Sequence, residues 1–124
     1  MVIEAVSDIL KGATSAFTLG SGSTNIGTAV LDFGAFPGAS DASVVVTGQT
    51  GILSTSVVNA FIRPVATADH TADEHLVETL QVRAGNIVVG TGFTIYGFNS
   101  NQINDSKGNG TRLSGQWTIS WTWA

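Results

Sequence analysis

Apolar and polar residues alternate with a period of two over most of the chain from residue 28 onward. Short stretches of this kind are separated by turn-forming residues, such as Gly34, Pro37-Gly38 and Asn109-Gly110. Such alternation is typical of half-buried strands, and glycine-rich breaks are typical of the turns between them. The stretches that predict strands are 28–33, 42–47, 56–63, 76–84, 87–89, 93–98 and 112–123.

This succession of short strands, with no helix-length segment between them, predicts an all-β domain over residues 28–124. We expect an antiparallel β-sandwich or jelly roll of about seven to eight strands. The stretch 76–84 is ambiguous, because the letters HLVETLQV could also form two helical turns.

The N-terminal residues have a different pattern. Residues 1–11 place apolar side chains at three- and four-residue spacing, which indicates a short helix, although the same residues could form an extended arm. A stretch rich in Gly and Ser, 20–27, follows and is typical of a flexible connection. We therefore expect residues 1–27 to be an arm and linker whose apolar side contacts a partner. The residues predicted to make this contact are Val2, Ile3, Val6, Ile9 and Leu10.

The last predicted strand places three tryptophans on one face, since Trp117, Trp121 and Trp123 alternate with polar residues. A period-two apolar face usually lies in the core, and the pattern favours that interpretation. The alternative is an exposed row of indoles, which would suit stacking against sugar rings or an interface with another subunit. Trp123 is the indole most expected to lie at an interface.

Charge is sparse, since charged residues make up 11% of the chain, against about 25% in an ordinary soluble domain. A weakly charged surface offers little protection against self-association, so we expect the protein to assemble with partners. The net charge of −4, with scattered basic residues, disfavours a nucleic-acid partner, which needs clustered Lys and Arg. No stretch approaches the roughly 18 apolar residues of a membrane span. The absence of cysteine excludes disulfides and thiol chemistry.

One segment, 69–78, contains both histidines and four of the nine acidic residues. Histidine and carboxylate groups together can hold a metal or perform acid–base chemistry. However, His70 and His75 are five residues apart and share neither a helix face nor one side of a strand, and the HExxH pattern is absent. The segment therefore favours a turn rich in side chain–backbone hydrogen bonds, or a charged contact, over a metal or catalytic site. We expect no enzymatic activity and no cofactor.

Four segments resemble small virion proteins of tailed bacteriophages and prophages in their residue pattern and in their order along the chain. They are DFGAFPGASDASVVVTGQTGI, FIRPVATADHTADEH, AGNIVVGTGFTIYGFNSNQ and GQWTISWTWA, and the stretch they span covers about three quarters of the chain. The resemblance implies a β-domain that folds in the host cytoplasm and persists in the virion. It assigns no role to a numbered residue, and it leaves capsid cement, head fibre and tail component open.

Together these observations predict a capsid decoration, or cement, protein on the capsid surface that binds the major capsid protein or other virion subunits and stabilises the head. A homo-oligomer is expected, and a trimer is one symmetric form it could take. The alternative is a carbohydrate- or surface-binding module of a head fibre or tail, with Trp117, Trp121 or Trp123 as the stacking platform.

Overall fold

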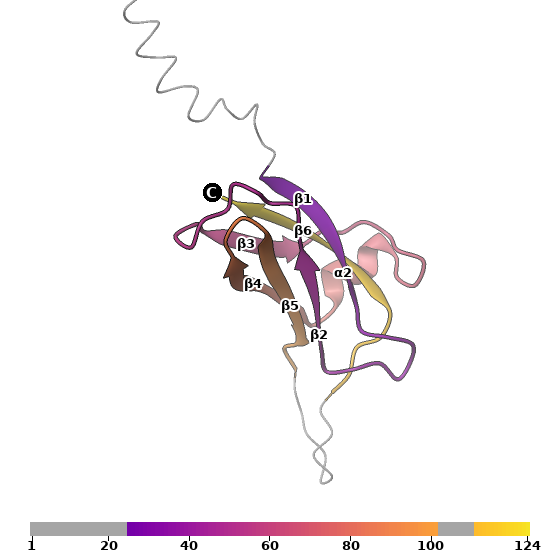
Figure 1. Cartoon of the computed structure of the whole chain (residues 1–124). Coiled ribbons are helices and arrows are strands. Elements are labelled where there is room, and N and C mark those ends of the chain that lie inside the picture. The colour runs from indigo at the N-terminus through magenta and orange to yellow at the C-terminus, as the bar shows by residue number, and fades with distance from the viewer. Residues whose placement is uncertain (1–24, 102–110) are drawn as a thin grey trace, which may run out of the picture.

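The computed structural model describes residues 25–101 and 111–124, which form two facing antiparallel sheets (Figure 1). One sheet has the strand order β1-β6-β3 and the other β2-β5-β4. The predicted all-β sandwich is confirmed. The elements are β1 (Ile26–Asp32), β2 (Asp41–Val46), β3 (Val58–Ile62), α2 (Ala72–Val77), β4 (Leu80–Val88), β5 (Gly92–Asn99) and β6 (Gln116–Trp123).

The core lies between the two sheets and follows from the period-two pattern. On β6, Trp117, Ile119 and Trp121 point inward and are buried, and Phe93 and Ile95 do the same on β5. Because successive side chains of a strand point to opposite faces, each sheet presents one apolar face to the other. The remaining buried apolar residues are Leu31, Phe33, Val46, Ile52, Ala60, Leu80 and Leu113.

The predicted strand over 76–84 is wrong at its beginning. Residues Ala72–Val77 form the helix α2, because Thr71 caps its N-terminus and Glu74 returns a hydrogen bond to the Thr71 backbone. Such a reciprocal capping box satisfies two amide groups that a helix N-terminus otherwise leaves free. Strand β4 then begins at Leu80 and continues, with a register irregularity after Gly85, to Val88, which includes most of the stretch predicted as a separate strand at 87–89. The described residues therefore contain six strands.

Smaller differences occur at other strand ends. Strand β1 begins at Ile26, two residues before the predicted start. Strand β6 begins at Gln116 instead of residue 112, and Leu113 before it forms an isolated bridge with Ala39. The predicted arm contacts at residues 2, 3, 6, 9 and 10 lie outside the described residues. Within the described ranges, no helix is long and apolar enough to cross a membrane.

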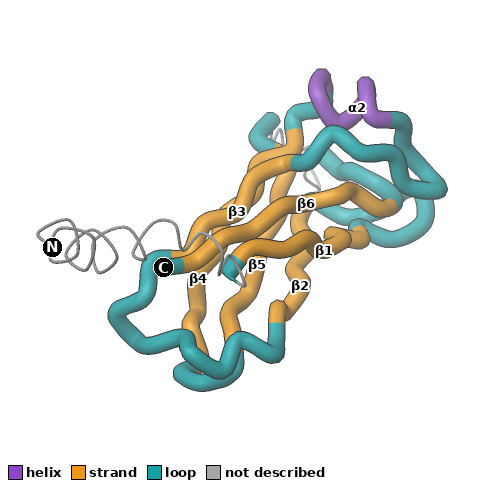
Figure 2. Tube along the Cα trace, turned by 90° about the horizontal axis from the view of Figure 1, so that it is seen from above, coloured by secondary structure: helices purple, strands orange, loops and turns teal. Residues whose placement is uncertain are grey.

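The sandwich has two ends of different construction. Figure 2 shows α2 and its neighbouring loops at the end opposite the C-terminus. At the C-terminal end, the β2–β3 loop meets the β4–β5 turn, where the Gln49 amide donates to Thr91 (2.8 Å) and the Gly90 amide donates to Ile52 (3.0 Å).

Candidate assembly surface

Among the residues that the structure describes, the end of the sandwich that carries the C-terminus has no charged side chain. We call it the uncharged pole and define it as residues 47–57, 88–91 and 122–124, which contain no Asp, Glu, Lys, Arg or His. Four large apolar side chains of this pole, Leu53, Val57, Val88 and Val89, are each more than half exposed. Apolar groups gathered where no charge interrupts them mark a surface suited to contact with another macromolecule.

The loops of the uncharged pole are held in place by the protein. Ile52 is fully buried beneath them, and its carbonyl accepts a hydrogen bond from Gly90 on the facing turn. The indole nitrogen of Trp123 donates to the Gln49 side chain at 2.8 Å. Side chains displayed on a fixed framework lose less conformational entropy when a partner covers them. The pole therefore presents a preorganised apolar surface.

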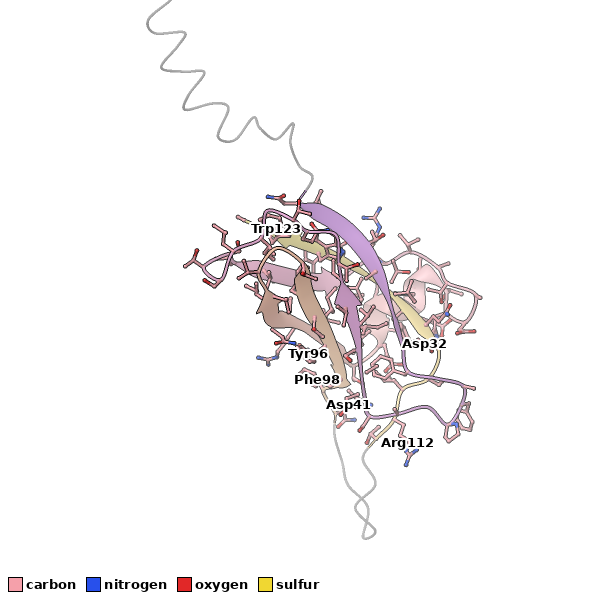
Figure 3. The ribbon with its side chains drawn as sticks, in the orientation of Figure 1. Asp32, Asp41, Tyr96, Phe98, Arg112 and Trp123 are labelled. Atoms are coloured by element: carbon pink, nitrogen blue, oxygen red, sulfur yellow. The ribbon has the colours of Figure 1, made fainter. Side chains whose placement is uncertain are left out.

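The three tryptophans of β6 have different environments. Trp117 and Trp121 are buried between the sheets, which confirms the core interpretation for these two indoles. Trp123 is half-buried at the uncharged pole (Figure 3). It lines a surface pocket of about 320 Å³ with Gln49 and Gly51. A continuous exposed row of three indoles is therefore ruled out. Trp123 alone is available for a contact.

The N-terminal segment joins the domain at this same pole. Ile26 pairs with Thr122 at the end of β6, and the Trp123 amide donates to the Asn25 carbonyl at 3.0 Å. Residues 1–24, with the predicted arm contacts, are therefore covalently attached beside the exposed apolar loops.

The opposite end contains the segment with both histidines. Side chains of this segment form hydrogen bonds with the part of β6 that β3 does not reach. Strand β6 extends beyond the last residue that β3 pairs with, which leaves backbone groups of Gln116 and Thr118 without a strand partner. The Thr118 amide donates to His75 Nε2 (3.0 Å), and the Gln116 amide donates to Asp69 (3.0 Å). Thr67 donates to the Gln116 carbonyl (2.8 Å). These side chains complete the edge of β6.

The two histidine rings also cover the buried indole of Trp117. His70 stacks on the indole with the ring centroids 3.7 Å apart, and His75 meets it edge-on at 4.9 Å. Because Trp117 is among the largest fully buried side chains, the histidines close the core at this end. We call residues 67–75 the histidine clasp.

All four ring nitrogens of the histidine clasp are engaged with protein atoms. His70 contacts Glu74 through Nδ1 (3.0 Å) and the Ser114 carbonyl through Nε2 (2.6 Å). His75 contacts the Thr71 carbonyl through Nδ1 (2.7 Å), while its Nε2 accepts from Thr118. This leaves no ring nitrogen for a metal, and the described residues contain no group of three or more metal-ligating side chains. The interpretation of the segment as a hydrogen-bonded turn is confirmed.

The contacts of His70 perturb two pKa values. Burial opposes the charged imidazole, but the hydrogen bonds to Glu74 and to the Ser114 carbonyl outweigh this effect, and the pKa of His70 lies above its usual 6.5. The same hydrogen bond from His70 lowers the pKa of Glu74 below its usual 4.5. The two side chains therefore form an ion pair when His70 is protonated, on the surface of the clasp.

Comparisons with protein-family models, curated proteins and solved structures found no match to this chain. The proposals that follow therefore depend on the residues described above and on the resemblance of four segments to small virion proteins.

Proposed function

We propose that this protein is an assembly subunit, and more narrowly a decoration or cement protein on the capsid of a tailed bacteriophage. The observation that carries the proposal is the uncharged pole, where exposed apolar side chains lie on loops that hydrogen-bond to one another. The resemblance of four segments to small virion proteins supports the narrower part.

Covering the exposed apolar side chains of the uncharged pole contributes a favourable free energy. Each exposed Val or Leu contributes on the order of 1 kcal/mol when it is removed from water. No charged side chain of the pole has to be desolvated, a step that often cancels the gain in an interface. Contacts of this strength become effective when many copies act together on a repeating surface.

The arm is assigned a role in the same contact. Its apolar residues, 2, 3, 6, 9 and 10, are attached at the uncharged pole through Asn25. Together they would clamp neighbouring subunits of the head, with the major capsid protein as partner and a homo-oligomer as the decorating unit. The alternative of a stacking platform on the C-terminal tryptophans is not favoured, because Trp117 and Trp121 are buried.

Self-association of the full chain tests the assembly proposal. Val57, 72% exposed at the uncharged pole, and Leu76, 69% exposed at the opposite end, are a matched pair. We expect light scattering to show concentration-dependent association of the wild-type protein, its loss in Val57→Asp and its retention in Leu76→Asp. A wild-type protein that stays monomeric, or two variants with equal effects, would contradict a contact at this pole.

Particle association tests the narrower proposal. We expect the protein to co-sediment in stoichiometric amounts with heads from a lysogen that carries its gene. Deletion of residues 1–20, which leaves β1 intact, should reduce its occupancy on these heads. Unchanged occupancy would reject the arm contact, and a protein absent from the particles would reject the virion role.

A further inference from the structure

The outer face of the β2-β5-β4 sheet carries an ordered array of side chains that the assembly proposal does not use. Its centre is β5, where Gly97 faces the core and the side chains before and after it point outward. The register of the sheet places polar residues of β2 and β4 on either side of these aromatic rings. The two adjacent rows are Asp41, Phe98 and Gln81, and Ser43, Tyr96 and Arg83.

The polar groups of this array are free to bind a ligand. Within residues 25–101 and 111–124, the side chains of Asp41, Ser43, Gln81 and Tyr96 make no hydrogen bond. Arg83 lies over the Phe98 ring at 5.6 Å, and its guanidinium likewise donates no hydrogen bond to a described residue. The array thus offers an acceptor, several donors and groups that do both, beside an aromatic ring that is 42% exposed.

The outer face of the other sheet provides a contrast. There the Thr118 hydroxyl donates to the Val65 carbonyl at 2.9 Å, and Ser120 accepts from Arg63 at 3.4 Å. Phe61 on that face is 46% exposed, close to the exposure of Tyr96, but its direct cross-strand partner Ser120 already has a hydrogen-bond partner. Free hydrogen-bonding capacity around an aromatic ring therefore distinguishes the β2-β5-β4 face.

We propose that this face binds a saccharide, with Tyr96 stacking against the apolar face of a sugar ring. A surface pocket of about 420 Å³ lies here, lined by Asp41, Ser43, Tyr96 and Phe98 together with the backbone of β2 and β5. Figure 3 shows Asp41, Tyr96 and Phe98 close together near the ends of these strands. Three strands span about 10 Å, which matches one or two sugar rings.

The chemistry of the array favours a saccharide over other ligands. Sugar hydroxyls donate and accept at once, so they can satisfy both the Asp41 carboxylate on β2 and the Gln81 and Arg83 donors on β4, on either side of β5. A phosphate-rich ligand is disfavoured, because a carboxylate lies in the array with its one cation. A second copy is disfavoured, because interface cores are depleted of charged residues.

Titration of the isotope-labelled full chain by NMR tests this proposal. The probes are neutral oligosaccharides of glucose, galactose, mannose and N-acetylglucosamine, each at millimolar concentration. We expect at least one to shift amide signals of residues 41–43, 81–83 and 96–98 and of no other region. Tyr96→Ala should weaken its binding by about tenfold, and Phe61→Ala should leave it unchanged.

Gln81→Ala provides a second variant that should fold like the wild type, because the Gln81 side chain is exposed and makes no hydrogen bond with any described residue. We expect it to weaken the same binding. The proposal is overturned if no saccharide shifts these signals, or if Tyr96→Ala and Phe61→Ala have equal effects. It is also overturned if the signals move with protein concentration alone, since the face would then be a contact between copies.

Discussion

The substitution His75→Ala tests whether the histidine clasp completes the fold. His75 is 3% exposed and accepts a hydrogen bond from the Thr118 amide beyond the end of β3. Alanine would remove this acceptor and would also leave space beside the Trp117 indole. We therefore expect a large loss of stability, although no catalytic or binding role is assigned to this residue.

The size of the loss follows from two contributions. A buried amide without a partner costs about 1–3 kcal/mol, and the space left by the imidazole adds on the order of 1 kcal/mol or more. We expect His75→Ala to lower the free energy of unfolding by about 3 kcal/mol, since Thr118 and Trp117 are both affected. For a domain of this size, such a loss lowers the Tm by about 10–20 °C.

Chemical denaturation followed by tryptophan fluorescence measures this change. The control is Leu76→Ala on the same helix, because that side chain is 69% exposed and its removal should cost less than about 0.5 kcal/mol. Equal unfolding midpoints for His75→Ala and Leu76→Ala would show that the hydrogen bond from the Thr118 amide to His75 does not stabilise the fold, and would refute this prediction.

Three further outcomes are expected. Glu74→Gln should lower the pKa of His70 in an NMR titration, whereas Asp73→Asn, which changes an acid in the same helical turn, should alter it much less. The raised pKa of His70 gives stability that is complete below pH 6.5 and lost as the pH rises through the folded-state value, while the lowered pKa of Glu74 gives stability present above pH 4.5 and lost as the pH falls. The difference in unfolding free energy between wild type and Glu74→Gln should therefore be largest between pH 4.5 and 6.5; a flat profile would contradict the ion pair. Gly38→Ala should be much more destabilising in thermal unfolding than Gly34→Ala, because both glycines have positive φ but only at Gly38 would a Cβ collide with the backbone opposite; equal losses of about 1–2 kcal/mol would show that φ alone matters.

The sandwich could be predicted because its main signal is local. Alternation of apolar and polar residues identifies the inner faces of β1, β2, β3, β5 and β6 without knowledge of their neighbours. For residues 76–84 the pattern left a strand and two helical turns open, and the helix α2 begins earlier, at Ala72. The capping box of Thr71 and Glu74 was present in the sequence and could have located the start of this helix.

The candidate surfaces could be predicted only in part. The absence of charge from residue 42 to 62 and from 84 to 104 is visible in the sequence. That two loops of these stretches meet at one pole depends on the strand order, which period-two patterns do not contain. For the same reason the array around Tyr96 was missed, since Ser43 and Arg83 become its neighbours only through the register of β2 and β4.

One end of the sandwich stabilises the fold, and the other end carries the proposed contact with partners. Asp69, His70 and Glu74 of the histidine clasp make hydrogen bonds that close β6 and the core, so their polar chemistry is used within the molecule. The uncharged pole is held by backbone hydrogen bonds and by buried Ile52, and its exposed side chains contribute little to the fold. A charge introduced at Val57 should therefore abolish assembly while the unfolding midpoint stays within the small range typical of surface substitutions. A fall in both properties together would mean that the pole is part of the core and not a surface for partners.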